Sequence, residues 1–169
     1  NYGMGWPYFT EELWLAAPGG GLAASMYAAS TVTATVGGGT RITVTEDTDY
    51  PFDETITLTV STPAPVAFPL HLRVPGWCRG PELTVNGTAV QAQDGPAFVK
   101  VDRTWADGDV VRLRLPQRTT LRTWSGNHDA VSVEHGPLTY SLKIDEQYVR
   151  YGGDDTFPFH EVHATSPWN

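Results

Sequence analysis

The sequence predicts an all-β protein: an antiparallel β-sandwich, jelly-roll or immunoglobulin-like, with one short N-terminal helix and an irregular C-terminal tail. Two observations predict this class. Apolar and polar residues alternate in many short runs, a pattern typical of strands with one buried and one wet face. Turn residues separate these runs at nearly regular spacing, which favours two packed sheets. A closed barrel is the alternative architecture.

The helix is expected over residues 6–17. Pro7 suits a first helical turn, and Trp6, Phe9 and Leu13 recur at three- and four-residue spacing as one apolar stripe. Pro18 and the glycines after it end the helix. The stripe needs a partner, either the β domain that follows or a helical domain upstream. If that partner is missing, we expect the chain to self-associate or to have a mobile N-terminal segment.

The strands follow from the alternation, and about nine are expected. The segments are residues 31–36, 41–45, 55–60, 68–74, 83–85, 98–101, 110–115, 131–133 and 138–142. Asn86-Gly87, between residues 83–85 and 88–90, is the dipeptide most typical of a two-residue hairpin. The alternation fails after Lys143. The predicted divisions are therefore a helix and linker over 1–21, a sandwich over 22–144, and a tail or lid over 145–169 that starts a truncated C-terminal section.

Composition excludes several classes of protein. The 169 residues carry a formal net charge of −8, whereas nucleic-acid and anionic-membrane binders need a basic face. No apolar run approaches the ~18 residues of a spanning helix. The one cysteine, Cys78, excludes an internal disulfide and multi-cysteine zinc motifs. No signal peptide opens the chain, but trimming could have removed one, so a bacterial cytoplasmic and a secreted location both stay open.

Groups that could carry chemistry are few, and each has a plainer structural interpretation. Two histidines three apart could bind a metal with help from others, but the spacings match no strong ligand motif. Cys78 could be a nucleophile, although a lone cysteine beside a tryptophan is more often a buried hydrophobe. Carboxylate pairs suited to glycoside hydrolysis all fall in turns, where aspartate is common. We therefore expect no catalytic residue, metal ligand or cofactor site in this chain. The candidates are His128, His135, His160, His163, Glu161, Asp129, Cys78 and the pairs Asp47/Asp49, Asp53/Glu54, Asp107/Asp109 and Asp154/Asp155.

Tryptophans at strand ends leave a choice between two roles. Trp77, Trp105 and Trp124 could form a platform on which sugar rings stack, or they could seal the edges of the sandwich. Trp77 closes the apolar strand over residues 68–74, so we expect it to be largely buried. Asn86-Gly87-Thr88 also matches the N-glycosylation pattern, although the hairpin explains the same residues.

Several stretches, in their order and spacing, resemble one known family. Together they are similar to the region that follows the catalytic domain in bacterial glycoside hydrolases of the β-L-arabinofuranosidase type. The stretches are residues 5–9 (GWPYF), 48–53 (TDYPFD), 72–78 (LRVPGWC), 83–87 (LTVNG), 105–109 (WADGD), 134–140 (EHGPLTY) and 166–169 (SPWN).

The resemblance implies an accessory role. In that family an (α/α)6 barrel carries catalysis, and a zinc-bound cysteine with further Cys and Glu ligands acts as the nucleophile. Those residues would precede residue 1, and Cys78 matches the sandwich motif instead. The resemblance thus implies a structural β-sandwich, inactive alone, with the helical catalytic domain as its partner and plant-type arabinose-containing glycans as the parent's substrates. An independent carbohydrate-binding module is the alternative, with carbohydrate as the partner. A homo-oligomer stays open.

Overall fold

Two facing β-sheets form the larger unit of the protein. The computed structural model describes residues 2–166, which fall into two units. The first unit runs through Thr120 and includes residues 134–138, and the second contains residues 121–133 and the chain from Thr139 onward. Among the described residues, no helix is long and apolar enough to cross a membrane. The all-β class predicted from the alternation is confirmed.

The first sheet of the sandwich has four strands. Their order is β1-β2-β6-β9, with β1 at Trp14–Ala17, β2 at Gly21–Ala24, β6 at Val66–Val74 and β9 at Ala97–Trp105. Only the β2–β6 pair of this sheet is parallel. The strands β6 and β9 pair along nine residues, from Val66 opposite Trp105 to Val74 opposite Ala97. Because β9 comes last in the strand order, it forms one edge of the sheet.

The second sheet has six strands, all antiparallel. Their order is β3-β4-β5-β10-β7-β8, with β3 at Ser30–Val36, β4 at Thr40–Asp47, β5 at Thr55–Ser61, β10 at Val110–Arg114, β7 at Glu82–Val85 and β8 at Thr88–Val90. Burial alternates along β5, so that Ile56, Leu58 and Val60 face inward while its threonines face outward. The period of two in the sequence is therefore the period of burial in the fold.

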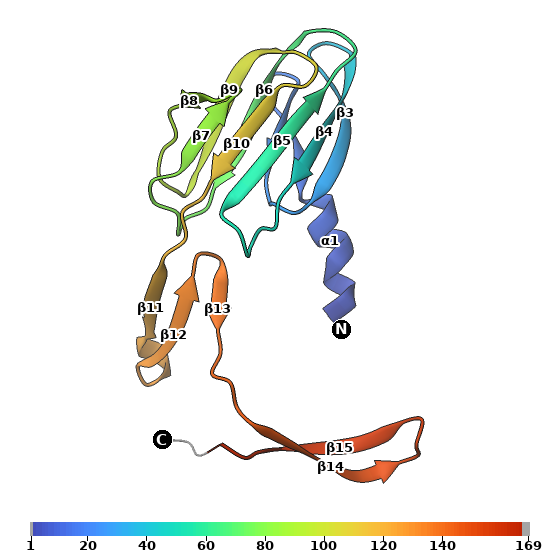
Figure 1. The fold of residues 1–169 in the computed structure, drawn as a ribbon, viewed down its shortest axis with the longest axis vertical. Coiled ribbons are helices and arrows are strands. Elements are labelled where there is room, and N and C mark those ends of the chain that lie inside the picture. The colour runs from blue at the N-terminus through green and yellow to red at the C-terminus, as the bar shows by residue number, and fades with distance from the viewer. Residues whose placement is uncertain (1, 167–169) are drawn as a thin grey trace. The chain divides into compact units, whose positions relative to one another are not determined.

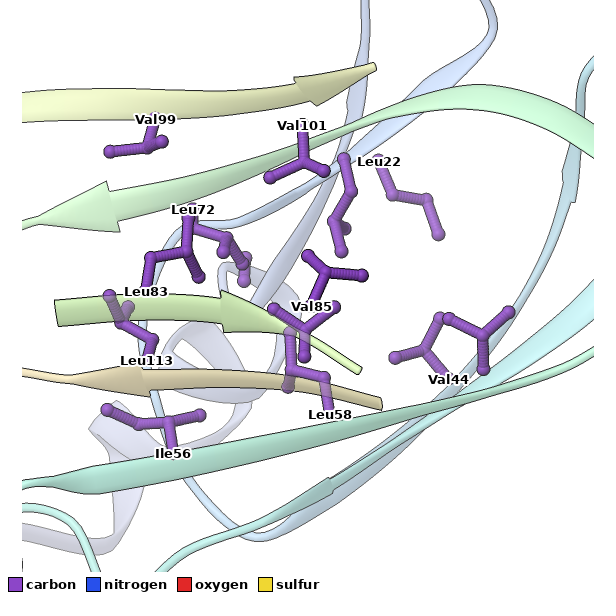
Figure 2. Close-up of a cluster of buried hydrophobic side chains, with 14 of the residues drawn as sticks. Leu22, Val44, Ile56, Leu58, Leu72, Leu83, Val85, Val99, Val101 and Leu113 are labelled. Carbon is purple, nitrogen blue, oxygen red and sulfur yellow. The ribbon is translucent and has the colours of Figure 1, made fainter. Parts of the chain in front are cut away.

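The core lies between these two sheets. Both sheets contribute fully buried aliphatic side chains, and Figure 2 shows Leu72, Val99 and Val101 of the first sheet with Ile56 and Leu113 of the second in one cluster. Trp105 and Phe68 are the largest of the buried side chains. Burial of this apolar surface is the main contribution that stabilises the sandwich.

The hairpin predicted at Asn86-Gly87 is confirmed. The strands β7 and β8 pair from Leu83 opposite Val90 to Val85 opposite Thr88. Asn86 has φ 50° and Gly87 has φ 77°, the left-handed values that a two-residue turn of this kind requires. The Asn86 carboxamide also bonds across to β10 and its turn, which fixes the hairpin to the sheet.

The expected helix over residues 6–17 is wrong in its second half. The α-helix α1 covers only Trp6–Glu11, after a 3-10 turn, η1, at Tyr2–Gly5. Residues 14–17 instead form β1 and pair with β2 through a tight turn, where Gly19 and Gly20 have positive φ. A Cβ on Gly21 would lie 2.2 Å from the carbonyl oxygen of Pro69. Glycine there lets β2 approach β6, and the ladder overrides the helical spacing.

The expected irregular tail is also corrected. Residues 146–164 contain an antiparallel hairpin of β14 (Glu146–Gly153) and β15 (Pro158–Ala164), with a register shift between Arg150 and Gly152. The sequence shows no alternation here because most side chains on both faces of the hairpin are exposed. The four residues of the last motif, 166–169, lie mostly outside the described residues.

The strands expected at residues 131–133 and 138–142 lie in a third sheet rather than in the sandwich. Its order is β11-β12-β13, with β11 at Thr119–Trp124, β12 at Ala130–His135 and β13 at Leu138–Tyr140. A short 3-10 turn, η2, covers Ser125–Asn127 between β11 and β12. Figure 1 labels the three strands of this sheet.

Candidate functional site

A cleft of about 400 Å³ lies in the larger unit, beside α1. Its walls come from α1, from the β2–β3 and β4–β5 connections and from the end of β6, segments far apart in the sequence. Aromatic rings dominate these walls. The principal lining residues are Trp6, Phe9, Tyr27, Tyr50, Pro51 and Arg73.

Polar groups behind the cleft are paired within the protein. The buried Tyr27 hydroxyl donates to the carbonyl oxygen of Arg73 at 2.7 Å. The Arg73 guanidinium donates through Nη1 to the carbonyl oxygen of Ser25 at 3.2 Å. Tyr27 also contacts the Tyr50 ring edge-on, with 5.9 Å between ring centroids. Burial raises the pKa of both phenols, so both stay protonated near neutral pH.

Glu46 is a buried carboxyl group that the sequence analysis missed. It is 2% exposed and accepts hydrogen bonds from the Ala28 amide and the Ser30 hydroxyl. Burial raises its pKa to about 7, and those two bonds oppose the rise. The alternation of β4 carried a signal for it, because Ile42, Val44 and Glu46 occupy successive inward positions.

The cleft beside α1 has no group suited to bond cleavage. No aspartate, glutamate, cysteine or histidine is among the described residues that line it. Glycoside hydrolysis by the common mechanism needs two carboxyl groups about 5–10 Å apart. The walls of this cleft are therefore mainly apolar and aromatic, with Arg73 as their charged group.

Cys78 belongs to the core. Its side chain is 0% exposed, and its backbone N–H closes a turn onto the carbonyl oxygen of Pro75. Burial raises the pKa of the Cys78 thiol, and Asp94 adds to the rise more than Arg79 opposes it. A nucleophilic cysteine needs a lowered pKa and access to solvent, and Cys78 has neither.

Three of the aspartates in turns accept hydrogen bonds from backbone amides. Asp107 accepts from the Thr62 amide, Asp53 accepts from the Thr55 amide, and Asp154 accepts from the amides of residues 156 and 157. Glu54 pairs with Arg114 at 2.8 Å.

Asp109 has the most partners of these carboxylates. It accepts from the Asn86 carboxamide at 2.7 Å and from the Ala106 amide at 2.9 Å, and it lies 3.5 Å from Arg103. Burial alone would raise the pKa of Asp109, but these three partners outweigh burial and hold the pKa below its usual value. Its lone pairs are committed to the hairpin and its neighbouring turn. The same bonds occupy the Asn86 side chain, so the hairpin accounts for the glycosylation-like pattern.

The histidines do not converge. In β15, His160 lies opposite Arg150 and His163 lies opposite Gln147, an odd spacing that places the two rings on opposite faces of the hairpin. His163 instead lies 3.4 Å from Glu161 on its own face. His135 contacts the Thr119 hydroxyl at 3.0 Å. Between residues 2 and 166, no group of three or more His, Cys, Asp or Glu side chains could hold a metal ion.

The three tryptophans at strand ends have three different environments. Trp105 is 0% exposed and donates through Nε1 to the carbonyl oxygen of Phe68 at 2.9 Å. Trp77 is only partly buried and packs against the core from its rim, so the expectation that it is largely buried is met in part. Trp124 is 44% exposed, with the Arg122 guanidinium 3.9 Å from its ring centroid.

Comparison with known proteins identifies the family of the sandwich. A family model described as beta-L-arabinofuranosidase, GH127 middle domain, matches residues 21–117. The chain belongs to this family. The matched range begins at β2 and ends just after β10, so it covers every strand of the β-sandwich except the edge strand β1. No curated protein is similar enough in sequence to match the chain.

Solved structures share the fold of this GH127 chain. A GH127 β-L-arabinofuranosidase from Geobacillus stearothermophilus T6 matches with a TM-score of 0.70 and 21% identity, over 92% of this chain and 32% of that chain. A glycoside hydrolase matches with a TM-score of 0.64 and 23% identity, over 89% of this chain and 29% of that chain. A GH127 β-arabinofuranosidase matches with a TM-score of 0.66 and 19% identity, over 86% and 28%. The chain thus spans about a third of the length of these proteins.

Proposed function

We propose that the chain is an accessory, structural β-sandwich of a glycoside hydrolase of the β-L-arabinofuranosidase type, and that it has no turnover by itself. The parent's substrates would be plant-type glycans that contain arabinose. The GH127 middle-domain match and the names of the structural neighbours support this proposal.

The main support for a non-catalytic role is that the potentially reactive side chains already have structural roles in the sandwich. Cys78 is buried with a raised pKa, and Asp107 and Asp109 accept hydrogen bonds from backbone and side-chain donors. A catalytic acid or nucleophile must instead face substrate within hydrogen-bond reach. These side chains stabilise the sandwich, and none of the three is among the residues that line the cleft beside α1.

The partner of the sandwich would be the helical catalytic domain of its parent. A helix as short as the six residues of α1 is marginal alone, and none of its residues is buried. Met4, Trp6 and Tyr8 are 67%, 58% and 71% exposed. We assign α1 and the cleft beside it to the contact with that domain, because both present aromatic surface that water disfavours.

Zinc would be held outside this chain. The resemblance implies a zinc site in the catalytic domain, and the residues described here offer no cluster that fits one. Structural and catalytic zinc sites need three or four convergent His, Cys or carboxylate ligands.

The experiment that tests this role separates the two parts. The catalytic portion of the parent and this chain are produced as two polypeptides and mixed, and hydrolysis of 4-nitrophenyl β-L-arabinofuranoside is followed with each part alone and together. We expect this chain to be inactive and to stabilise the catalytic portion when added. The variants Trp6→Ala and Tyr50→Ala should weaken that effect, whereas Phe52→Ala, whose ring is 82% exposed outside the cleft, should not. Full activity and stability of the catalytic portion without this chain would contradict the accessory role.

The alternative function, an independent carbohydrate-binding module, has one feature in its favour. It is a second cleft, lined by polar groups and an exposed ring, at the β9 edge of the sandwich.

A further inference from the structure

The second cleft has a volume of about 360 Å³ and lies along strand β9. One wall is the segment that joins β8 to β9, through Gln91, Ala92 and Gln93. The other wall is β9 itself, through Phe98, Val99 and Lys100. The volume falls within the range of roughly 300–1,000 Å³ that is typical of small-ligand clefts.

The aromatic ring beside this cleft, that of Phe98, is about half exposed. Phe98 is 48% exposed at the second position of the nine-residue strand β9, whereas Val99 and Val101 of the same strand are buried. In the part of the chain that the structure describes, its ring stacks on no other aromatic ring. Exposing about half of this ring to water is unfavourable. Phe98 is among the residues that line the cleft, so its exposed ring stands where a ligand in the cleft could contact it.

The polar groups around the ring are available for hydrogen bonds. The Gln91 and Gln93 carboxamides have no hydrogen-bond partner among residues 2–166, and each offers donors and an acceptor. Lys100 lies 2.7 Å from Asp102, which offsets its charge and leaves further N–H donors. Since β9 is an edge strand, part of its backbone N–H and C=O groups also face away from the sheet.

The loop wall is held in place by the rest of the sandwich. Its end is fixed where Gly95 N–H donates to the carbonyl oxygen of Cys78 and Arg79 donates to the carbonyl oxygen of Gly95. Asp94 accepts from the Gly80 amide at 2.7 Å. A Cβ on Gly95 would lie 1.8 Å from the carbonyl oxygen of Pro75, so the loop passes directly against the end of β6. An anchored wall loses less entropy when a ligand binds.

We propose that this cleft, which we call the Phe98 cleft, is a binding site for one or two sugar residues of a neutral glycan. The apolar face of a sugar ring would stack on Phe98, and its hydroxyl groups would bond to the carboxamides of Gln91 and Gln93 and to the Lys100 ammonium. Hydroxyl groups both donate and accept, as carboxamides do, which favours a sugar over an anion or an apolar segment. A neutral glycan fits better than an acidic one because Asp102 already pairs with Lys100.

An extended peptide added to β9 is the competing occupant of an edge strand. The cleft contacts β9 at only three residues, 98–100, whereas strand addition uses backbone groups along several more. The observations therefore favour a compact ligand. The choice of arabinose-containing glycans as probes rests on the proposed function, but the site itself rests on the Phe98 cleft.

The test is a titration of the whole chain, labelled with ¹⁵N, against α-1,5-linked arabinotriose and methyl β-L-arabinofuranoside. We expect saturable amide shifts confined to residues 91–93 and 98–100. Phe98→Ala should weaken binding about tenfold or more, and Phe98→Tyr, which keeps the ring, should stay within about threefold. Phe52→Ala is the matched control, since it removes a more exposed ring elsewhere and should leave affinity unchanged.

Two results would overturn the proposal: no shifts in the cleft with either sugar, or sugar shifts that Phe98→Ala leaves intact. A hexapeptide of alternating Thr and Val that shifts β9 while the sugars do not would assign the edge to strand addition instead. If Phe98→Ala fails to fold, the double variant Gln91→Ala/Gln93→Ala gives the same test. If the parent hydrolyses the arabinofuranoside but no sugar binds in the Phe98 cleft, only this inference is wrong. If sugar binds in the cleft but the parent shows no hydrolysis, only the proposed function is wrong.

Discussion

Replacing Trp105 by alanine should be among the most destabilising single changes in the sandwich. The side chain is 0% exposed, its ring lies 5.7 Å from that of Phe68, and its Nε1 donates to the Phe68 carbonyl oxygen. Large-to-small changes of Phe or Trp in a core cost roughly 3–5 kcal/mol of unfolding free energy. The buried carbonyl group also loses a donor, which costs about 1–3 kcal/mol when it stays unpaired. The two contributions sum to about 4–8 kcal/mol, so we expect Trp105→Ala to cost at least about 4 kcal/mol of unfolding free energy.

The two contributions can be separated by Trp105→Phe. This change keeps an aromatic ring and removes the N–H donor, so it should cost about 1–3 kcal/mol, mostly from the unpaired Phe68 carbonyl group. The assay is urea unfolding followed by far-ultraviolet circular dichroism, with the slope of the transition checked for each variant.

Two other tryptophans serve as controls for Trp105. Trp77→Ala should cost less, about 1–2 kcal/mol, because Trp77 is only partly buried at the rim of the core. Trp6→Ala should stay within about 0.5 kcal/mol, because its side chain is 58% exposed. A loss below about 1 kcal/mol for Trp105→Ala, or one no larger than that for Trp77→Ala, would refute the reasoning from burial.

Three further predictions concern Glu46, Asn86 and Cys78. The pKa of Glu46 is raised from 4.5 to about 7, so protonation of this carboxyl group favours the folded state. This stabilisation, about 3 kcal/mol of unfolding free energy, should be fully present below pH 4.5 and lost as the pH rises through 7. Unfolding measured from pH 4.5 to 8 should therefore show a fall in stability that Glu46→Gln flattens, and parallel curves for the two proteins would contradict this. Asn86→Ala should cost about 3 kcal/mol through the left-handed φ and the lost bonds to Asp109 and Val110, and Asn86→Gly should recover the backbone part. Cys78 should react with a thiol reagent only at the rate of unfolding, and fast labelling of the native chain would show that it is accessible.

The sequence predicted the sandwich because one physical constraint shapes most of its residues. A strand that faces the core on one side must alternate; β5 follows that rule throughout, and β6 departs from it at the buried Pro69. The hairpin at Asn86 was predictable for a local reason, since two successive positive φ values favour asparagine followed by glycine.

Two segments were mispredicted. One is compatible with both helix and strand, and the other has no buried face to impose an alternation. Residues 14–17 continue the helical spacing of the apolar stripe. The glycine turn after them lets them pair with β2 instead, and the hydrogen bonds of that pairing favour a strand over a helix. The hairpin of β14 and β15 exposes both faces, so no alternation marks it.

The two clefts depend on tertiary structure. The cleft beside α1 joins segments as distant as Trp6 and Arg73, and no local pattern could place them together. The Phe98 cleft had a weak local signal, since a phenylalanine stands at an outward position of β9. The buried carboxyl group of Glu46 was readable from the alternation of β4, where it occupies an inward position.

The accessory role is tested most directly by turnover. The isolated chain and its full-length parent are assayed side by side on 4-nitrophenyl β-L-arabinofuranoside, with zinc quantified in both. The account predicts hydrolysis and bound zinc in the parent only, because the reactive side chains described here hold the sandwich together. Turnover by the isolated chain that disappears in Cys78→Ser or His160→Ala would contradict the account, since one of those residues would then carry the chemistry.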